Sequence, residues 1–142
     1  MPHELQSPEL QAWAVGFPLA LLHAAVTMLI LVAGAALYAL ITPHREIQLI
    51  REGNAAAAVS FAGVLVGLAI PIAVSLGHSS SVAEVALWGV ASLAVQLLAF
   101  RFTDMILRGL PQRIQEGEMS AAAVLVGAKL AVALIVAAAW TG

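Results

Sequence analysis

Four long apolar runs, separated by short polar stretches, dominate the pattern of the chain. They cover about residues 17–41, 55–76, 82–102 and 119–140. Each run has roughly the 20 residues that an α-helix needs to cross a hydrocarbon core of about 30 Å. Backbone groups in lipid are satisfied only within helices or closed barrels, and the runs lack the alternation of a barrel strand. The pattern therefore predicts an all-α membrane protein with four transmembrane helices.

The sequence of the polar stretch after the first run is partly repeated after the third run. Residues 50–54 read Ile-Arg-Glu-Gly-Asn, and residues 114–118 read Ile-Gln-Glu-Gly-Glu. The apolar run that follows each stretch has a glycine at the same place, Gly63 in one and Gly127 in the other. A constant offset over half of the chain predicts two tandem helical hairpins, related as a parallel internal repeat.

These hairpins would form a single membrane domain over residues 1–142. We place repeat one at about 14–76 and repeat two at about 82–140. Residues 1–13 would then form a short outer-side tail or an interfacial helix. Ser7 before Pro8 resembles a helix start, and Pro18 would let such a helix turn into the membrane.

Charge decides the expected orientation. Five of the six basic residues lie in the two longer connections, and basic residues near transmembrane ends stay cytoplasmic. They are Arg45, Arg51, Arg101, Arg108 and Arg113. We therefore expect a multi-pass membrane protein with both termini on the outer side (N-out/C-out) and the two longer connections in the cytoplasm.

Composition excludes several functions. The chain is 62% hydrophobic and 10% charged, so a soluble fold would have to bury nearly all of it. It has no cysteine, which excludes disulfides, thiol catalysis and iron–sulfur clusters in this chain. The histidines are scattered, and neither a catalytic triad, a phosphate loop nor a basic cluster is present. We therefore expect no catalytic site, metal, cofactor or nucleic-acid partner.

The cytoplasmic connections have local patterns of their own. Thr42 followed by Pro43 resembles an N-cap and a first helical residue, and Gly53 would end that short helix. In the second connection, Leu107, Leu110 and Ile114 share a helical face. Each connection is either a short amphipathic helix in the interface or the solvated extension of a spanning helix.

Three charged residues stand near the inner end of the third run. Arg101, Asp104 and Arg108 have the helical spacing i, i+3 and i+7. Side chains at such spacings share a helical face, so we expect these charges to pair at the cytoplasmic mouth.

Three further segments stand out: Ile41 to Glu46, Leu49 to Ala58 and Gly67 to Pro71. They closely resemble those of one family, the YjfL-like inner-membrane proteins of bacteria. The resemblance implies two copies of the domain of unknown function 350 and a location in the bacterial inner (plasma) membrane, with both termini then periplasmic, and it implies no established reaction. The family-like positions are Pro43, His44, Glu46, Gly53, Asn54, Gly63, Gly67 and Pro71. Glu118 departs from the pattern, because the family's repeat tends to have asparagine there.

Lys129 is the most costly residue in the chain. It lies about ten residues into the fourth run, where a lysine costs about 2.5–3.5 kcal/mol on insertion scales. Its side chain leans towards the N-terminus of its helix, so its expected neighbours are Gln96, Ser92 and Ser60. The equivalent position in the first repeat is the apolar Leu65. The duplicated fold therefore does not need a cation there.

Three interpretations of Lys129 are open. It snorkels towards the inner headgroups or into a hydrogen-bonded cavity, it binds an anion or lines an ion path, or it is neutral and carries protons. The second interpretation would suit a ring of lysines in an oligomer.

Small residues indicate how the helices pack. Gly63 and Gly67 form a GxxxG pair, and Ala123, Gly127 and Ala131 form a matching stripe in the fourth run. These stripes either meet each other within one chain or pack between chains. By pseudo-symmetry we favour packing of the second and fourth spans at the centre. Pro71 is expected to kink the second span.

The sequence favours a structural or accessory component of the envelope that acts as a homo-oligomer in the lipid bilayer. Membrane protein partners are not identified by the sequence. The alternative is a small ion channel or transporter subunit with a polar path near Lys129. That alternative requires Lys129, Gln96 and Ser92 on a common water-filled surface.

Overall fold

The computed structural model describes residues 7–42 and 45–142, and this part of the chain is helical and contains no strand. The helices are α1 (Pro8–Ile41), α2 (Glu46–Arg51), α3 (Ala55–Gly77), α4 (Val82–Ile106), α5 (Leu110–Gln115) and α6 (Met119–Ala139). The helices α1, α3, α4 and α6 are long and apolar enough to cross a membrane. The prediction of an all-α protein with four candidate spans is confirmed.

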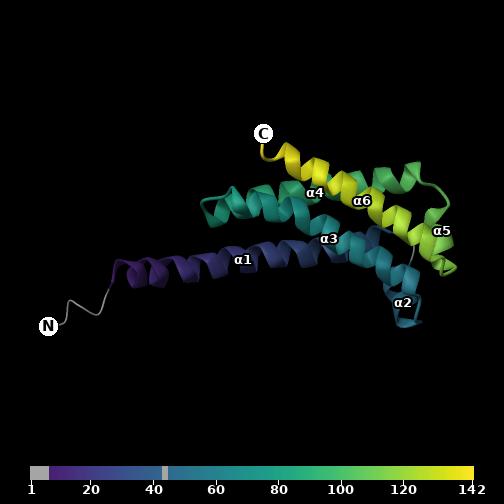
Figure 1. Ribbon diagram of the computed structural model, residues 1–142, viewed down its shortest axis with the longest axis horizontal. Coiled ribbons are helices and arrows are strands. Elements are labelled where there is room, and N and C mark those ends of the chain that lie inside the picture. Colours follow the sequence, from purple (N-terminus) through teal and green to yellow (C-terminus); the bar gives the residue numbers. More distant parts are fainter. Residues whose placement is uncertain (1–6, 43–44) are drawn as a thin grey trace.

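Helix α1 is continuous over 34 residues. It begins as expected, because the Ser7 side chain accepts a hydrogen bond from the N–H of Leu10 at 3.3 Å. It then runs through Pro18, so the described part of the expected outer segment is the start of α1 and not a separate helix. At 1.5 Å per residue α1 is about 51 Å long, which exceeds the hydrocarbon core. Its N-terminal half extends past the other helices (Figure 1).

Thr42 ends α1 and does not begin α2. Its hydroxyl donates to the Tyr38 carbonyl at 2.7 Å, and its N–H donates to the same oxygen at 3.0 Å. The expectation of Thr42 as an N-cap is therefore wrong, because its side chain bonds back to the preceding turn. Helix α2 has Arg45 at its N-cap position, and Pro43 and His44 lie outside the described residues.

Two glycines reverse the chain after the short helices α2 and α5. Gly53 has φ 87° and Gly117 has φ 85°, a conformation that glycine adopts without steric cost. Each N–H donates to the carbonyl three residues earlier, at 3.0 Å to Ile50 and 2.9 Å to Ile114. The prediction that Gly53 ends the first short helix is confirmed.

Helices α3 and α6 make the most extensive contact in the protein, as expected. A Cβ atom on Gly63 would lie 2.6 Å from Val126 Cγ2 of α6, so the two backbones approach closely there. Gly67 instead faces the Phe100 ring of α4, with 2.6 Å from its Cβ position to Cζ. Helix α3 continues through the buried Pro71 to its end, and the expected kink stays a prediction.

The expected small-residue stripe of α6 does not form this contact. Ala123, Gly127 and Ala131 are exposed, and no atom lies within 4 Å of a Cβ placed on Gly127. The opposite face of α6 is buried instead, with Ala121, Ala122, Leu125, Lys129, Ala133 and Ala137. Because α6 is apolar almost all round, its sequence does not reveal which face turns inward.

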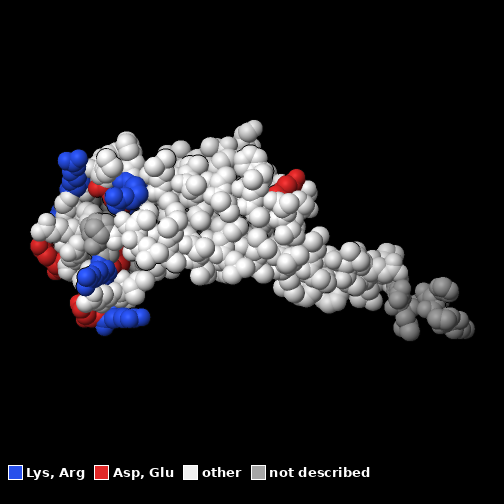
Figure 2. Space-filling view, turned by 180° about the vertical axis from the view of Figure 1, so that it is seen from behind, with Lys and Arg blue, Asp and Glu red and all other residues white. Residues whose placement is uncertain are grey.

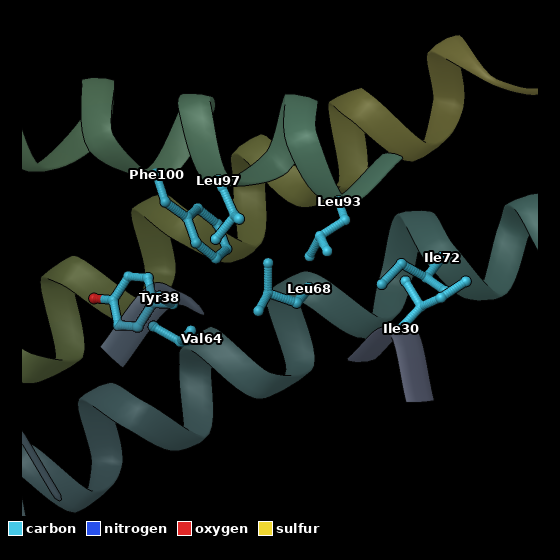
Figure 3. Close-up of a cluster of buried hydrophobic side chains, with 8 residues drawn as sticks. All are labelled: Ile30, Tyr38, Val64, Leu68, Ile72, Leu93, Leu97 and Phe100. Atoms are coloured by element: carbon cyan, nitrogen blue, oxygen red, sulfur yellow. The ribbon is translucent and has the colours of Figure 1, made fainter. Parts of the chain in front are cut away.

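Two apolar clusters hold the helices together. The first joins α1, α3 and α4, and Figure 3 shows its members: Ile30, Tyr38, Val64, Leu68, Ile72, Leu93, Leu97 and Phe100. The rings of Tyr38 and Phe100 meet edge to face with their centroids 6.3 Å apart. The second cluster lies at the α2 and α5 end and contains Ala56, Ala57, Ile114, Ala121, Ala122 and Leu125.

The short helices α2 and α5 pack on the ends of the spans. Leu107, Leu110 and Ile114 all belong to or pack against the second cluster. Only Leu110 and Ile114 lie on α5, because Leu107 is the C-cap of α4, so the three residues do not lie on one helix as expected. Both α2 and α5 are separate from the helices that precede them. On the face shown in Figure 2, the basic side chains and most of the acidic ones lie at the end of the molecule that Figure 1 labels α2 and α5.

Candidate functional site

The ammonium of Lys129 lies inside the helix bundle, with 1% of the residue exposed. Its Nζ atom donates to the Tyr38 hydroxyl at 2.8 Å and lies 3.0 Å from Asp104 Oδ1. It also lies 4.8 Å from the centre of the Tyr38 ring and 5.3 Å from that of Phe100. An ion pair, a hydrogen bond and two aromatic faces thus replace the water that this charge lacks.

The helix arrangement brings these groups together from three spans. Tyr38 lies in the last turn of α1, and Asp104 lies in the last turn of α4. Lys129 is in the middle of α6, and its side chain leans towards the N-terminus of that helix. The three spans meet towards the charged end of the molecule, so the Lys129 ammonium links α6 to α1 and α4.

A second carboxylate, that of Glu46 at the start of α2, is buried close to this ion pair. Glu46 is 5% exposed, and the Ser60 hydroxyl of α3 donates to its Oε1 at 3.4 Å. Its Oε2 is buried without a hydrogen-bond partner among the described residues. Burial raises the pKa of Glu46 to about 7, and Asp104 adds to the rise, while Lys129 and the Ser60 hydrogen bond oppose it.

The expected neighbours of Lys129 are only partly right. Gln96 and Ser92 are fully buried on α4, but within the described ranges their side-chain polar atoms have no hydrogen-bond partner. Ser60 is buried too, and it bonds to Glu46. Lys129 reaches further towards the charged end than we expected, to Tyr38 and Asp104. The sequence contains one signal that points to this pair, since Asp104 is an acid close to the end of a span.

The expected pairing of Arg101, Asp104 and Arg108 along α4 is not found. Asp104 pairs with Lys129, and Arg108 Nε donates to the Met105 carbonyl at 3.2 Å. In the part of the chain that the structure describes, no ion pair joins Asp104 to either arginine. A buried ammonium competes better for the carboxylate than arginines that water can solvate.

Asn54 links the two hairpins at the charged end. Its Oδ1 caps α3 by accepting from the N–H of Ala57 at 3.0 Å. Its Nδ2 donates to the carbonyls of Ile114 and Gln115, each at 3.0 Å. These carbonyls belong to the last turn of α5, so one amide satisfies the start of one helix and the end of another.

Glu118 stands at the corresponding place before α6 and behaves differently. Its side chain makes no cap bond, and it pairs with Arg113, whose Nε donates to Oε2 at 2.6 Å. The hydrogen bond from Arg113, with another from Ser120, lowers the pKa of Glu118 to about 2. An ionised carboxylate has no proton to donate, so it cannot bond to helix carbonyls as Asn54 does.

We expect Asn54→Ala to lower the stability of the protein by about 0.5–2 kcal/mol or more, because the α3 cap and both bonds to α5 are lost. Asn54→Ser keeps a side-chain oxygen that can cap α3 and loses only the two donors to α5, so its loss should be smaller. Thermal unfolding in detergent micelles measures both changes. Equal losses for the two variants would contradict separate roles for the two atoms.

The site is thus a buried group of two carboxylates, one ammonium and one phenol. It joins five helices, because Glu46 is on α2 and its hydrogen-bond donor Ser60 is on α3. Among the described residues, no three His, Asp or Glu side chains come together as they would around a metal ion. Chemically, the group can hold helices together and can bind or release a proton.

Comparison with known proteins identifies a family. The model of the Domain of Unknown Function (DUF350) matches residues 12–140. The chain is 36% identical over 78 residues to the UPF0719 inner membrane protein YjfL of Escherichia coli (strain K12), and equally to that of Escherichia coli O157:H7. Each match covers 55% of this chain and 59% of the relative, so the chain spans less than two thirds of these relatives. No solved structure matches.

Proposed function

The chain belongs to the Domain of Unknown Function (DUF350) family, and we propose that it acts as a structural or accessory component of the bacterial inner membrane and not as an enzyme. One observation carries this proposal. The Lys129 ammonium, the most costly group in the spans, is bonded inside the bundle to Tyr38 and Asp104. Its contacts hold three helices together, and a site of this kind stabilises an assembly without any need for a substrate.

The outer surface of the spans supports a location in lipid. Large apolar side chains are exposed along much of the bundle, and α1 alone exposes Leu22, Met28, Leu29, Val32 and Leu40. A surface of this kind suits acyl chains or the spans of another membrane protein. The curated relatives are inner membrane proteins by name, which supports the same location.

The proposed topology has both termini on the outer side and two tandem hairpins. The charged end formed by α2 and α5 supports a cytoplasmic position for that end, by the positive-inside rule (Figure 2). Helices α2 and α5 have equal lengths, and three residues separate each of them from the next span. The second of these three residues is in both cases a glycine with positive φ. This correspondence supports an origin by duplication.

The proposed homo-oligomer would use the exposed small-residue stripe of α6. Ala123, Gly127 and Ala131 lie at intervals of four residues on the outer face of the helix. Small side chains let two helix backbones approach closely in a membrane, where packing replaces the hydrophobic effect as the driving force. A neighbouring copy would fill this stripe better than disordered acyl chains.

We expect Gly127→Leu to shift the protein towards monomers, because the new side chain blocks close approach of a second helix. The fold of each chain should survive, since no atom lies within 4 Å of a Cβ at this position. Native mass spectrometry from lipid nanodiscs measures the distribution of oligomers.

Val124→Leu is the matched control, because Val124 is also exposed on α6 and already carries a branched side chain. It should leave the distribution unchanged. A wild-type protein that is monomeric in lipid, or a Gly127→Leu oligomer as large as that of the wild type, would contradict the proposed homo-oligomer.

The channel or transporter alternative has less support. It required Lys129, Gln96 and Ser92 on a common water-filled surface, and the three residues are at most 1% exposed. They are buried within one chain and do not face a path between copies. The structural role therefore remains the proposed function.

A further inference from the structure

The buried site has an imbalance of charge. Glu46 and Asp104 provide two carboxylates, and Lys129 provides one ammonium. Glu46 lies within electrostatic range of both Lys129 and Asp104, while Arg101 acts on Tyr38. With both acids ionised the group would carry one uncompensated negative charge away from water, which is costly. The missing charge can be supplied by one small cation.

Glu46 is the carboxylate that has room for this cation. Asp104 Oδ1 already lies 3.0 Å from the Lys129 ammonium. Glu46 Oε1 accepts a hydrogen bond from Ser60 at 3.4 Å, and Oε2 has no partner in residues 7–42 and 45–142. A buried carboxylate oxygen without a donor is costly as an anion, and protonation removes that cost.

Glu46 also borders a hollow at the charged end of the molecule. The hollow holds about 360 Å³ and is lined by Ala39, Arg45, Glu46, Ile47, Gln48 and Arg51. Its walls come from the last turn of α1, from Arg45 and from part of α2, so the hollow lies beside the exposed side chains of Arg45 and Arg51. Water in this hollow contacts Glu46, which is otherwise buried.

We propose that Glu46 is a proton-binding site, which takes one proton from the water of this hollow onto its carboxylate and returns it there. Uptake converts the carboxylate and one proton into a neutral carboxylic acid, with no other bond made or broken. Lys129 stays paired with Asp104 in both states, and Tyr38 keeps its hydrogen bond to Lys129. The assignment goes beyond the structural role, because it gives the site a ligand and a route of access.

The stability of the protein should depend on pH in a definite direction. The pKa of Glu46 rises from an ordinary 4.5 to about 7 in the folded protein. Between these values the folded protein holds the proton that the unfolded chain has lost, so stability falls as pH rises through this window. Glu46→Gln mimics the protonated form and should lack this part of the pH dependence.

Infrared difference spectroscopy of the full chain in nanodiscs tests the proton directly. The wild type should gain the carbonyl stretch of one protonated carboxylic acid as pH falls through about 7, in a choline buffer free of metal cations. Glu46→Gln should lack this band. Glu52→Gln is the matched control, since Glu52 is exposed at the end of the same helix, and it should keep the band.

A second variant tests the geometry without removing the carboxyl. Ser60→Ala removes a hydrogen bond that favours the ionised form, so the midpoint of the band should move to higher pH. An unchanged midpoint, or a band that survives in Glu46→Gln, would overturn the assignment.

A titration with sodium distinguishes a proton from a metal cation as the ligand of Glu46. Raising sodium in place of choline at constant pH should leave the band in place. If sodium instead shifts the midpoint to lower pH and so weakens the band at that pH, the site binds a metal cation and the proton assignment is wrong. Oligomeric state plays no part in this readout, so its failure is distinct from failure of the proposed structural role.

Discussion

Replacing Lys129 by methionine destabilises the protein by about 3–5 kcal/mol, the range found when one partner of a buried ion pair is removed. Methionine has nearly the length of lysine and fills the same space, so packing changes little. Asp104 loses its counter-ion, and the Tyr38 hydroxyl loses its hydrogen-bond donor. The cost therefore comes from the uncompensated acid and not from a cavity.

The free energy of unfolding in mixed micelles, measured by titration with denaturing detergent and followed by tryptophan fluorescence, reports this loss. Adding Asp104→Leu to Lys129→Met should restore most of the stability, because both charges are then absent. Arg51→Met is the surface control, since Arg51 is exposed on α2, and it should change stability by less than about 0.5 kcal/mol. A Lys129→Met protein as stable as the wild type would show that the ion pair between Lys129 and Asp104 does not stabilise the bundle.

Replacing Gly63 by alanine lowers stability by about 1–3 kcal/mol relative to the same change at Gly127, because it overpacks the contact between α3 and α6. The added methyl carbon at position 63 would lie 2.6 Å and 2.8 Å from the two Cγ atoms of Val126. Valine is branched at Cβ and has few rotamers, so it cannot turn both methyl groups away. The helix backbones must therefore separate.

Gly127 is the matched control for Gly63. Both glycines lie inside spans, so each substitution gains the same advantage of alanine over glycine, about 1 kcal/mol. Within one chain nothing lies within 4 Å of the added carbon at Gly127, so only that gain remains there when both variants are compared as detergent-dissociated monomers. The difference between the melting temperatures of the two variants in one detergent measures the effect of the clash with Val126. Equal melting temperatures would contradict a close approach of α3 and α6 at Gly63.

The candidate site divides into a part that the sequence predicts and a part that it does not. Lys129 stands out because a charge inside an apolar run is rare and costly. Its partners do not stand out, because Tyr38 and Asp104 are ordinary residues near the ends of other spans. The sequence marks Glu46 only as part of a family-like motif, and its burial beside Ser60 follows from the packing of α2 against α3.

Features that depend on local forces can be predicted from the amino-acid sequence. Long apolar runs form helices because lipid leaves backbone groups no other partner, and Gly53 ends α2 because glycine adopts a positive φ at little cost. Which faces of these helices meet depends instead on how the whole bundle packs. A helix that is apolar all round, such as α6, can turn any side inward, and the packing of α3 and α4 buries Lys129 and leaves Gly127 outside. The ion pair with Asp104 follows from that rotation.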